Sequence, residues 1–328
     1  MAEAKKKGKK KTGLFIFLGI IAALVIAFFA IGGVSGIMGT FMPLAMGKTS
    51  DAELQEMIKE SASKYQRDSY TDSETGLSVP YNIYLPDGYD ESKEYPMVVF
   101  IGDMTTAGST MKYSLTQGWG GIVWASSKVQ SKEPVIVVTL VFPETILDDN
   151  GGYKTTNYVD LTPRAVRAIA DKYAVDQNRI YGTGQSMGAM TTQLVASREP
   201  DLYAAVLIVD GQWDINELQG LKTQRMIFFA AGGDEKACNG QNDIMAMLDS
   251  KGISYSFIDG LDAQADRAEL ESAVSAILAE GNEHIFIRWK TGSVVEGTKA
   301  LDKSEHMNSF DYGYKLECVR DWILMQSR

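Results

Sequence analysis

The pentapeptide Gly-Gln-Ser-Met-Gly at residues 184–188 places a single serine, Ser186, between two glycines. The preceding segment NRIYGTG is apolar enough for a buried strand, and residues 186–198 have a helical pattern. A serine on a tight strand-to-helix turn presents its Oγ above the sheet, and flanking glycines relieve the crowding of that turn. The pattern therefore predicts a nucleophile, although a serine that only caps the helix would have the same surroundings.

A serine hydroxyl becomes a good nucleophile only beside a general base. The chain has two histidines, His284 and His306. His284 opens the expected strand HIFIRWKTG, which favours a buried or edge position. His306 lies in KSEHMNSF, an expected loop between the last strand and a C-terminal helix over 309–326. We therefore expect His306 to be the base.

The base needs a carboxylate that fixes its tautomer and stabilises the imidazolium. Asp234 follows the expected strand RMIFFAAGG, two strands after the serine, and is the favoured acid. Asp210 and Asp214 follow the intervening strand AAVLIV and remain alternatives. The chain order Ser186, Asp234, His306 is that of α/β-hydrolases.

Short apolar runs alternate with helical segments along the rest of the body, which predicts right-handed βαβ units and a mostly parallel sheet. The expected strands include LSVPYNIYL, YPMVVFIG, PVIVVTLVFP and SYSFIDG. Further helices are expected over 49–67, with Ser50 as N-cap and Glu53 completing a capping box, over 162–173, with Pro163 in the first turn, and over 266–280. The predicted fold class is an α/β-hydrolase fold: a mostly parallel central sheet flanked by helices and preceded by an N-terminal transmembrane helix.

The N-terminal segment has the features of a membrane anchor. Residues 12–47 contain no charge, the stretch 14–34 is long and apolar enough to cross a bilayer, and six lysines precede it. The positive-inside rule places the N-terminus in the cytoplasm and the body outside. We expect a basic cytoplasmic head (1–12), a transmembrane signal anchor (13–47), a helical stalk or packed helix (48–70) and a catalytic domain (71–328). Secretion after cleavage near Ala45 is the alternative.

Charge and cysteine content narrow the possible functions. The net charge is −10 although the first twelve residues are strongly basic, so the body is acidic and a nucleic-acid partner is not expected. Two cysteines, Cys238 and Cys318, cannot build a cysteine metal site. They form either one bridge or two separate buried thiols.

Four segments carry a resemblance to a known family: YNIYLPDGYDESKEYPMVVFIGD, VDQNRIYGTGQSMGAM, PDLYAAVLIVDGQWD and SEHMNSFDYGYKLECVRDWILMQ. Together they resemble secreted bacterial α/β-hydrolases often labelled predicted peptidases, which are related to polyhydroxybutyrate-depolymerase-like and feruloyl-type esterases. The resemblance covers about residues 77–326. It implies Ser186 as nucleophile, Asp234 as acid, His306 as base and the amide of Met187 as one oxyanion donor.

One position departs from that family. Its members usually have a His-Gly pair after the strand that corresponds to YPMVVFIG, and the loop that follows donates the second oxyanion N–H. Here Gly102 and Asp103 stand in that place. The amides of Asp103 and Met104 are the candidates for the second donor, but a carboxylate pointing inward would repel an oxyanion.

The substrate pocket is less well indicated by the sequence. Its candidates are Gln185, Gln212, Trp213, Trp119 and Trp124, although large aromatics are more often core residues. The acidic run 148–150 lacks the spacing of a calcium loop and is interpreted as a solvated turn. No metal or cofactor is expected.

These features predict a membrane-anchored extracytoplasmic serine hydrolase acting on a small-molecule or polymer ester through an acyl-enzyme. A serine peptidase of the same fold is one alternative. The other, prompted by Gly102 and Asp103, is a weak or inactive hydrolase-like surface binding protein.

Overall fold

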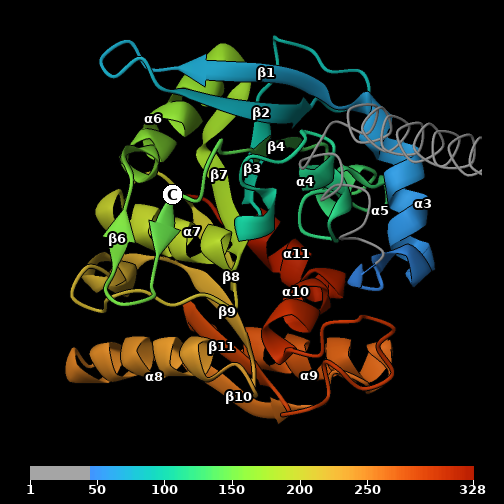
Figure 1. Ribbon diagram of the computed structural model, residues 1–328, viewed down its shortest axis with the longest axis vertical. Helices are drawn as coiled ribbons and strands as arrows, with labels where there is room; N and C mark the ends of the chain where they lie inside the picture. Colours follow the sequence, from blue (N-terminus) through green and yellow to red (C-terminus); the bar gives the residue numbers. More distant parts are fainter. Residues whose placement is uncertain (1–44) are drawn as a thin grey trace, which may run out of the picture.

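The computed structural model describes residues 45–328 (Figure 1). Apart from its last residues, the expected transmembrane segment over 13–47 lies outside this range. Within 45–328, no helix combines the length and the apolar character needed to cross a bilayer.

A nine-stranded sheet forms the centre of the described chain, in the order β1-β2-β4-β3-β7-β8-β9-β11-β10. Its strands are β1 Gln66–Thr71, β2 Ser78–Tyr84, β3 Tyr95–Ile101, β4 Ile136–Leu140, β7 Val175–Gln185, β8 Ala205–Val209, β9 Met226–Ala231, β10 Ser256–Leu261 and β11 His284–Trp289. Strands β1, β2 and β4 pair antiparallel, whereas the pairs from β4 to β10 are parallel. The mostly parallel sheet predicted from the sequence is confirmed.

Helices cover both faces of this sheet (Figure 1). One apolar core lies under α6 Asn157–Lys172, α7 Met187–Arg198 and α8 Glu235–Ser250. The other lies under α3 Ala52–Ser61, α4 Tyr113–Thr116, α5 Ser127–Gln130, α9 Arg267–Leu278, α10 Glu305–Lys315 and α11 Glu317–Met325. Strands β3, β4, β7, β8 and β9 carry almost only buried side chains in their carboxyl halves, as expected for strands covered on both sides.

The connectivity changes direction beside β3. The chain passes from β3 outward to β4 and then returns across β3 to β7. Ligand sites of open parallel sheets lie at the carboxyl ends of the strands next to such a reversal. The ends of β3 and β7 are therefore the place where the topology favours a site.

Several predicted boundaries are wrong. The first helix ends at Ser61, Arg67 belongs to β1, and the N-cap is Asp51, whose carboxylate accepts the Leu54 N–H at 3.0 Å, in place of Ser50. Helix α6 begins before Pro163, behind the cap Thr156, so the proline lies inside the helix. The sequence analysis did not identify β1 or α8.

The C-terminal helix is also different from the prediction. It is divided into α10 and α11 at Leu316, whose backbone is extended. Ser304 caps α10, and its side chain accepts the Met307 N–H. His306 therefore lies in the first turn of a helix rather than in a loop, which fixes its backbone.

Candidate active site

Ser186 stands on a strained turn between β7 and α7. Its φ of 52° and ψ of −119° lie outside the regions that side chains other than glycine usually adopt. The two flanking glycines permit close approaches. A Cβ on Gly184 would lie 2.3 Å from the Gly188 carbonyl carbon, and one on Gly188 would lie 1.9 Å from the Ile101 oxygen. The Ser186 side chain accepts no hydrogen bond from α7, so it does not act as a helix cap.

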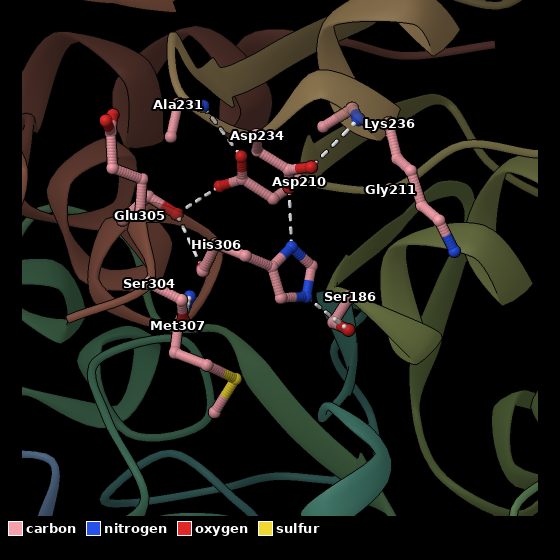
Figure 2. A network of polar contacts seen from close by, with 12 residues as sticks. Ser186, Asp210, Gly211, Ala231, Asp234, Lys236, Ser304, Glu305, His306 and Met307 are labelled. Carbon is pink, nitrogen blue, oxygen red and sulfur yellow. Dashed lines mark hydrogen bonds and ion pairs between the residues drawn. The ribbon is translucent and has the colours of Figure 1, made fainter. Parts of the chain in front are cut away.

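The structure brings Ser186, His306 and Asp234 together from three separate elements (Figure 2). The Ser186 Oγ lies 2.8 Å from the His306 Nε2. The other ring nitrogen, Nδ1, lies 2.5 Å from a carboxylate oxygen of Asp234. Asp234 is the N-cap of α8: its carboxylate accepts the Ala237 N–H at 3.2 Å, and this hydrogen bond orients the carboxylate.

Electrostatics make the imidazole a stronger base. Burial acts to lower the pKa of His306, but the hydrogen bond to Asp234 and the charges of Asp210 and Asp234 outweigh it, so the pKa is raised. Burial acts to raise the pKa of Asp234, yet the hydrogen bond and charge of His306 bring it below its ordinary value. The pair therefore favours an ionised carboxylate beside a readily protonated ring.

The end of β3 packs directly against the start of α7. The Cβ test at Gly188 places the carbonyl oxygens of Ile101 and Gly102 within 2.8 Å, so the loop after β3 adjoins the turn that carries Ser186. Within residues 45–328, the N–H groups of Met187, Asp103 and Met104 donate to no acceptor. These N–H groups are free to donate to a bound ligand, and their role as oxyanion donors stays a prediction.

The carboxylate of Asp103 is buried and fully engaged in the protein. One oxygen accepts the Thr105 N–H at 2.9 Å and its hydroxyl, and the other accepts the Gln185 side-chain amide at 2.8 Å. These donors turn the charge toward Gln185 and Thr105 rather than leaving it unpaired at the serine.

A cavity of about 680 Å³ opens beside Ser186. Apolar side chains of Met104, Leu147, Met187 and Met190 form part of its wall. The remaining wall is polar and is formed by Thr145, Asp148, Asp149, Asn150, Gln212, Asp234, Lys236 and His306.

Of the five pocket residues predicted from the sequence, the structure places only Gln212 on the cavity wall. Gln185 is buried behind Asp103. Trp213 packs against Tyr153 in the core, with ring centroids 5.0 Å apart. Trp119 lies under α3 and donates to Asp51, and Trp124 is fully buried. These tryptophans are buried and belong to the two hydrophobic cores of the sheet.

Sequence reasoning missed the polar side of the cavity. Asp148 and Asn150 are exposed in the turn of a hairpin, as predicted, but the run 148–150 also lines the cavity. The hairpin consists of β5 Leu147–Asp148 and β6 Lys154–Thr155. Asp149 accepts from Lys236 Nζ at 2.6 Å and from the Gln212 amide. The position of this run was a usable sequence signal, because its three oxygen-bearing side chains follow β4, the strand next to β3, along the chain.

The remaining candidates occupy other places. His284 is buried, and its Nε2 lies 2.9 Å from the Leu221 carbonyl oxygen. Asp214 closes a local turn through Asn216, and Asp210 does not contact the imidazole nitrogens. Cys238 and Cys318 are separate thiols. Within 45–328, no group of three His, Cys, Asp or Glu side chains is arranged to hold a metal ion.

Comparison with known proteins supports this architecture. Residues 145–247, less than half of the chain, match the prolyl oligopeptidase family. A thermostable esterase is 21% identical, with a TM-score of 0.65, over 82% of this chain and 64% of its own. A structure of FAE is 16% identical, with a TM-score of 0.52, over 80% of this chain and 87% of its own. The feruloyl esterase module from Clostridium thermocellum is 16% identical, with a TM-score of 0.48, over 76% of this chain and 90% of its own. A search of curated proteins found no match.

The sheet, the family match and the similarity to the thermostable esterase define the α/β-hydrolase fold. The segment that matches the prolyl oligopeptidase family contains Ser186 and Asp234. The chain therefore has the fold of these hydrolases, and it spans 64%, somewhat less than two thirds, of the length of the thermostable esterase.

Proposed function

We propose that this protein is a membrane-anchored extracytoplasmic serine hydrolase that cleaves carboxylic esters through an acyl-enzyme. The observation that carries the proposal is the continuous hydrogen-bonded path from the Ser186 Oγ through His306 to Asp234, at 2.8 Å and 2.5 Å. The strained turn exposes the hydroxyl, and the cavity beside it has room for a substrate.

In the first half-reaction, His306 Nε2 removes the Ser186 proton while the Oγ attacks the ester carbonyl carbon. Asp234 stabilises the imidazolium, and the Met187 amide together with the amide of Asp103 or Met104 holds the oxyanion. The imidazolium then protonates the leaving alcohol. In the second half-reaction, His306 activates water, which releases the acid and restores Ser186.

An ester substrate fits both the cavity and one of the structural similarities. The wall offers methionine and leucine side chains for an apolar group and carboxylate, amide and ammonium groups for a polar one. The fold is shared with a protein described as a thermostable esterase. A peptide substrate is the second candidate, since the match to the prolyl oligopeptidase family includes the serine and the acid.

Membrane anchoring is supported by the sequence alone. The apolar stretch over 14–34 follows six lysines, and no charge interrupts it before Lys48. Such a segment suits an uncleaved signal anchor that leaves the catalytic domain outside the cytoplasm.

The decisive experiment is labelling with a fluorophosphonate probe. The wild type should react, Ser186→Ala should not, and Ser197→Ala, which changes a half-buried serine at the far end of α7, should react as the wild type does. Labelling that persists in Ser186→Ala would overturn the assignment of the nucleophile. An unreactive wild type would favour the binding-protein alternative.

Substrate preference separates the two enzyme candidates. A panel of p-nitrophenyl esters and aminoacyl-peptide substrates should show Ser186-dependent turnover of esters and little turnover of peptides. Faster cleavage of peptides would replace the esterase assignment by a peptidase.

A further inference from the structure

A second buried carboxylate, Asp210, lies next to the Asp234–His306 pair without belonging to the proton path. It follows β8 directly and is fully buried. Its φ is 47°, and within residues 45–328 only Ser186 and Asp210 are non-glycine residues with a positive φ. Strained backbone at a buried charge is expensive and is concentrated at functional positions.

The contacts of Asp210 lead to the helix that carries the base. One oxygen accepts the Ala231 N–H at 2.7 Å, which ties it to the end of β9. The other oxygen accepts the Ser309 hydroxyl of α10. The Ser309 Oγ also lies 2.9 Å from the carbonyl oxygen of His306, which is in the first turn of that helix. Asp210 is thus connected to His306 through one side chain and the helix backbone.

Asp210 is one of three carboxylates whose charges raise the pKa of the His306 imidazole. The other two are Asp234, at the β9–α8 junction, and Asp103, which follows β3. Burial and the charge of Asp234 raise the pKa of Asp210 to about 7.

The nearby charged side chains of α8 and α10 are engaged elsewhere. Lys236 pairs with Asp149 at 2.6 Å. Glu305 accepts the N–H groups of Gly233 and Gly292.

We infer that Asp210 is a positioning residue for the base: it anchors the first turn of α10 through Ser309, and its negative charge favours the protonated form of His306. The inference rests on the proposed function for its kinetic consequence, but its electrostatic consequence can be measured without turnover.

The test compares Asp210→Asn with Asp214→Asn. Asparagine tolerates a positive φ, keeps an oxygen for the Ala231 N–H and removes the charge. Its amide nitrogen then faces the Ser309 Oγ, which can accept from it while the hydroxyl donates to the His306 carbonyl oxygen. Asp214 lies four residues further along, in a local turn with Asn216, and supplies the matched control. Ring titration by NMR on the full-length protein in detergent follows His306 directly. Because the chain has two histidines, a His306→Gln sample assigns the signals.

We expect the His306 pKa to fall by about half a unit or more in Asp210→Asn and to stay unchanged in Asp214→Asn. The acid limb of kcat/KM should move to lower pH by the same amount. Ser309→Ala should lower kcat about 3- to 10-fold with KM unchanged, since it loosens the helix. It should lower the ring pKa less than Asp210→Asn does, because the carboxyl stays in place and only the Ser309 hydrogen bond, which lowers the Asp210 pKa, is lost.

An unchanged ring pKa in Asp210→Asn, or an equal fall in Asp210→Asn and Asp214→Asn, would overturn the electrostatic role. An unchanged kcat in Ser309→Ala would overturn the anchoring role.

If Asp210→Asn does not fold, Asp210→Gly, which suits the positive φ, carries the same comparison. If neither folds, the wild-type titration decides: two steps support coupling to Asp210, and a single step overturns it. Failure of Ser186-dependent labelling would remove the proposed function while leaving the ring titration interpretable.

Discussion

Among single residues, the small number of histidines made the candidate site predictable from the sequence. With only two histidines, the base could be chosen by place in the chain, and the structure puts the chosen His306 beside Ser186. The choice among three aspartates was harder because strand order alone does not say which carboxylate reaches the ring. The structure places Asp234 there and leaves Asp210 on the neighbouring strand.

The sequence does not show where the carboxylate of Asp103 points. Its oxygens accept from Thr105 and Gln185, so its charge is paired by donors of the protein, although it still raises the pKa of His306. We predict that Asp103→Asn changes kcat by less than about threefold. The asparagine keeps an acceptor for Thr105, and the Gln185 oxygen, which has no partner within 45–328, can accept from the new amide.

Steady-state kinetics on one ester substrate check this prediction. Asp103→Ala is the contrasting variant, because it loses the cap of the short helix that follows and should be less stable by about 1 kcal/mol. A tenfold rise in kcat for Asp103→Asn would contradict the prediction, since it would mean that the charge opposes the oxyanion.

At the scale of elements, regular patterns were predicted and local terminations were not. Continuous apolar runs such as Tyr95–Ile101 and Met226–Ala231 identify buried strands because nothing polar can interrupt them there. The start of α10 was missed because the cap Ser304 lies in a polar stretch without apolar periodicity. The hairpin of β5 and β6 was missed because strands of two residues carry no pattern.

The contacts of that hairpin lead to a prediction about the cavity wall. Asp149 joins it to α8 through Lys236, at 2.6 Å, and to the loop after β8 through Gln212. In Asp149→Ala the wall of the cavity should loosen. We expect KM for a bulky aryl ester to rise about 3- to 10-fold while kcat for p-nitrophenyl acetate stays within about twofold, because the reacting groups are untouched.

Asp148→Ala is the matched control for this measurement. Asp148 also lines the cavity, but its carboxylate bonds only to Asn150 within the same turn. Equal effects of the two variants, or equal effects on large and small esters, would rule out a role for the Asp149 contacts in holding the wall.

At the scale of the whole molecule, the segment after the expected anchor is part of the folded body. Leu54 and Met57 of α3 are buried in the core. Lys48 pairs with Asp311 at 2.5 Å, and Asp51 pairs with Lys315 at 2.9 Å. Both partners belong to α10, so the beginning of the described chain contacts the helix that carries the base. The sequence left a stalk and a packed helix as alternatives, and the packing of α3 corresponds to the second.

This contact leads to a prediction about truncation. A form covering 48–328 should be soluble and should keep the kcat of the full-length protein, since it retains α3 and the Lys48 ion pair. A form covering 65–328 should lose about 3 kcal/mol or more of unfolding free energy, because removal of α3 exposes the surface that Leu54 and Met57 cover. Thermal unfolding and ester kinetics on both forms measure the two effects.

Membrane attachment is tested on the same set of proteins. The full-length chain should sediment with the membrane fraction, and its N-terminal sequence should begin at or near Met1. A start near residue 46 would show cleavage and replace the anchor by a signal peptide. Because Leu54 and Met57 of α3 are buried and Lys48 pairs with Asp311, either outcome leaves the docking of α3 intact. Release of the 48–328 form into the soluble fraction with unchanged activity would then locate attachment in the first 47 residues and catalysis in the remainder.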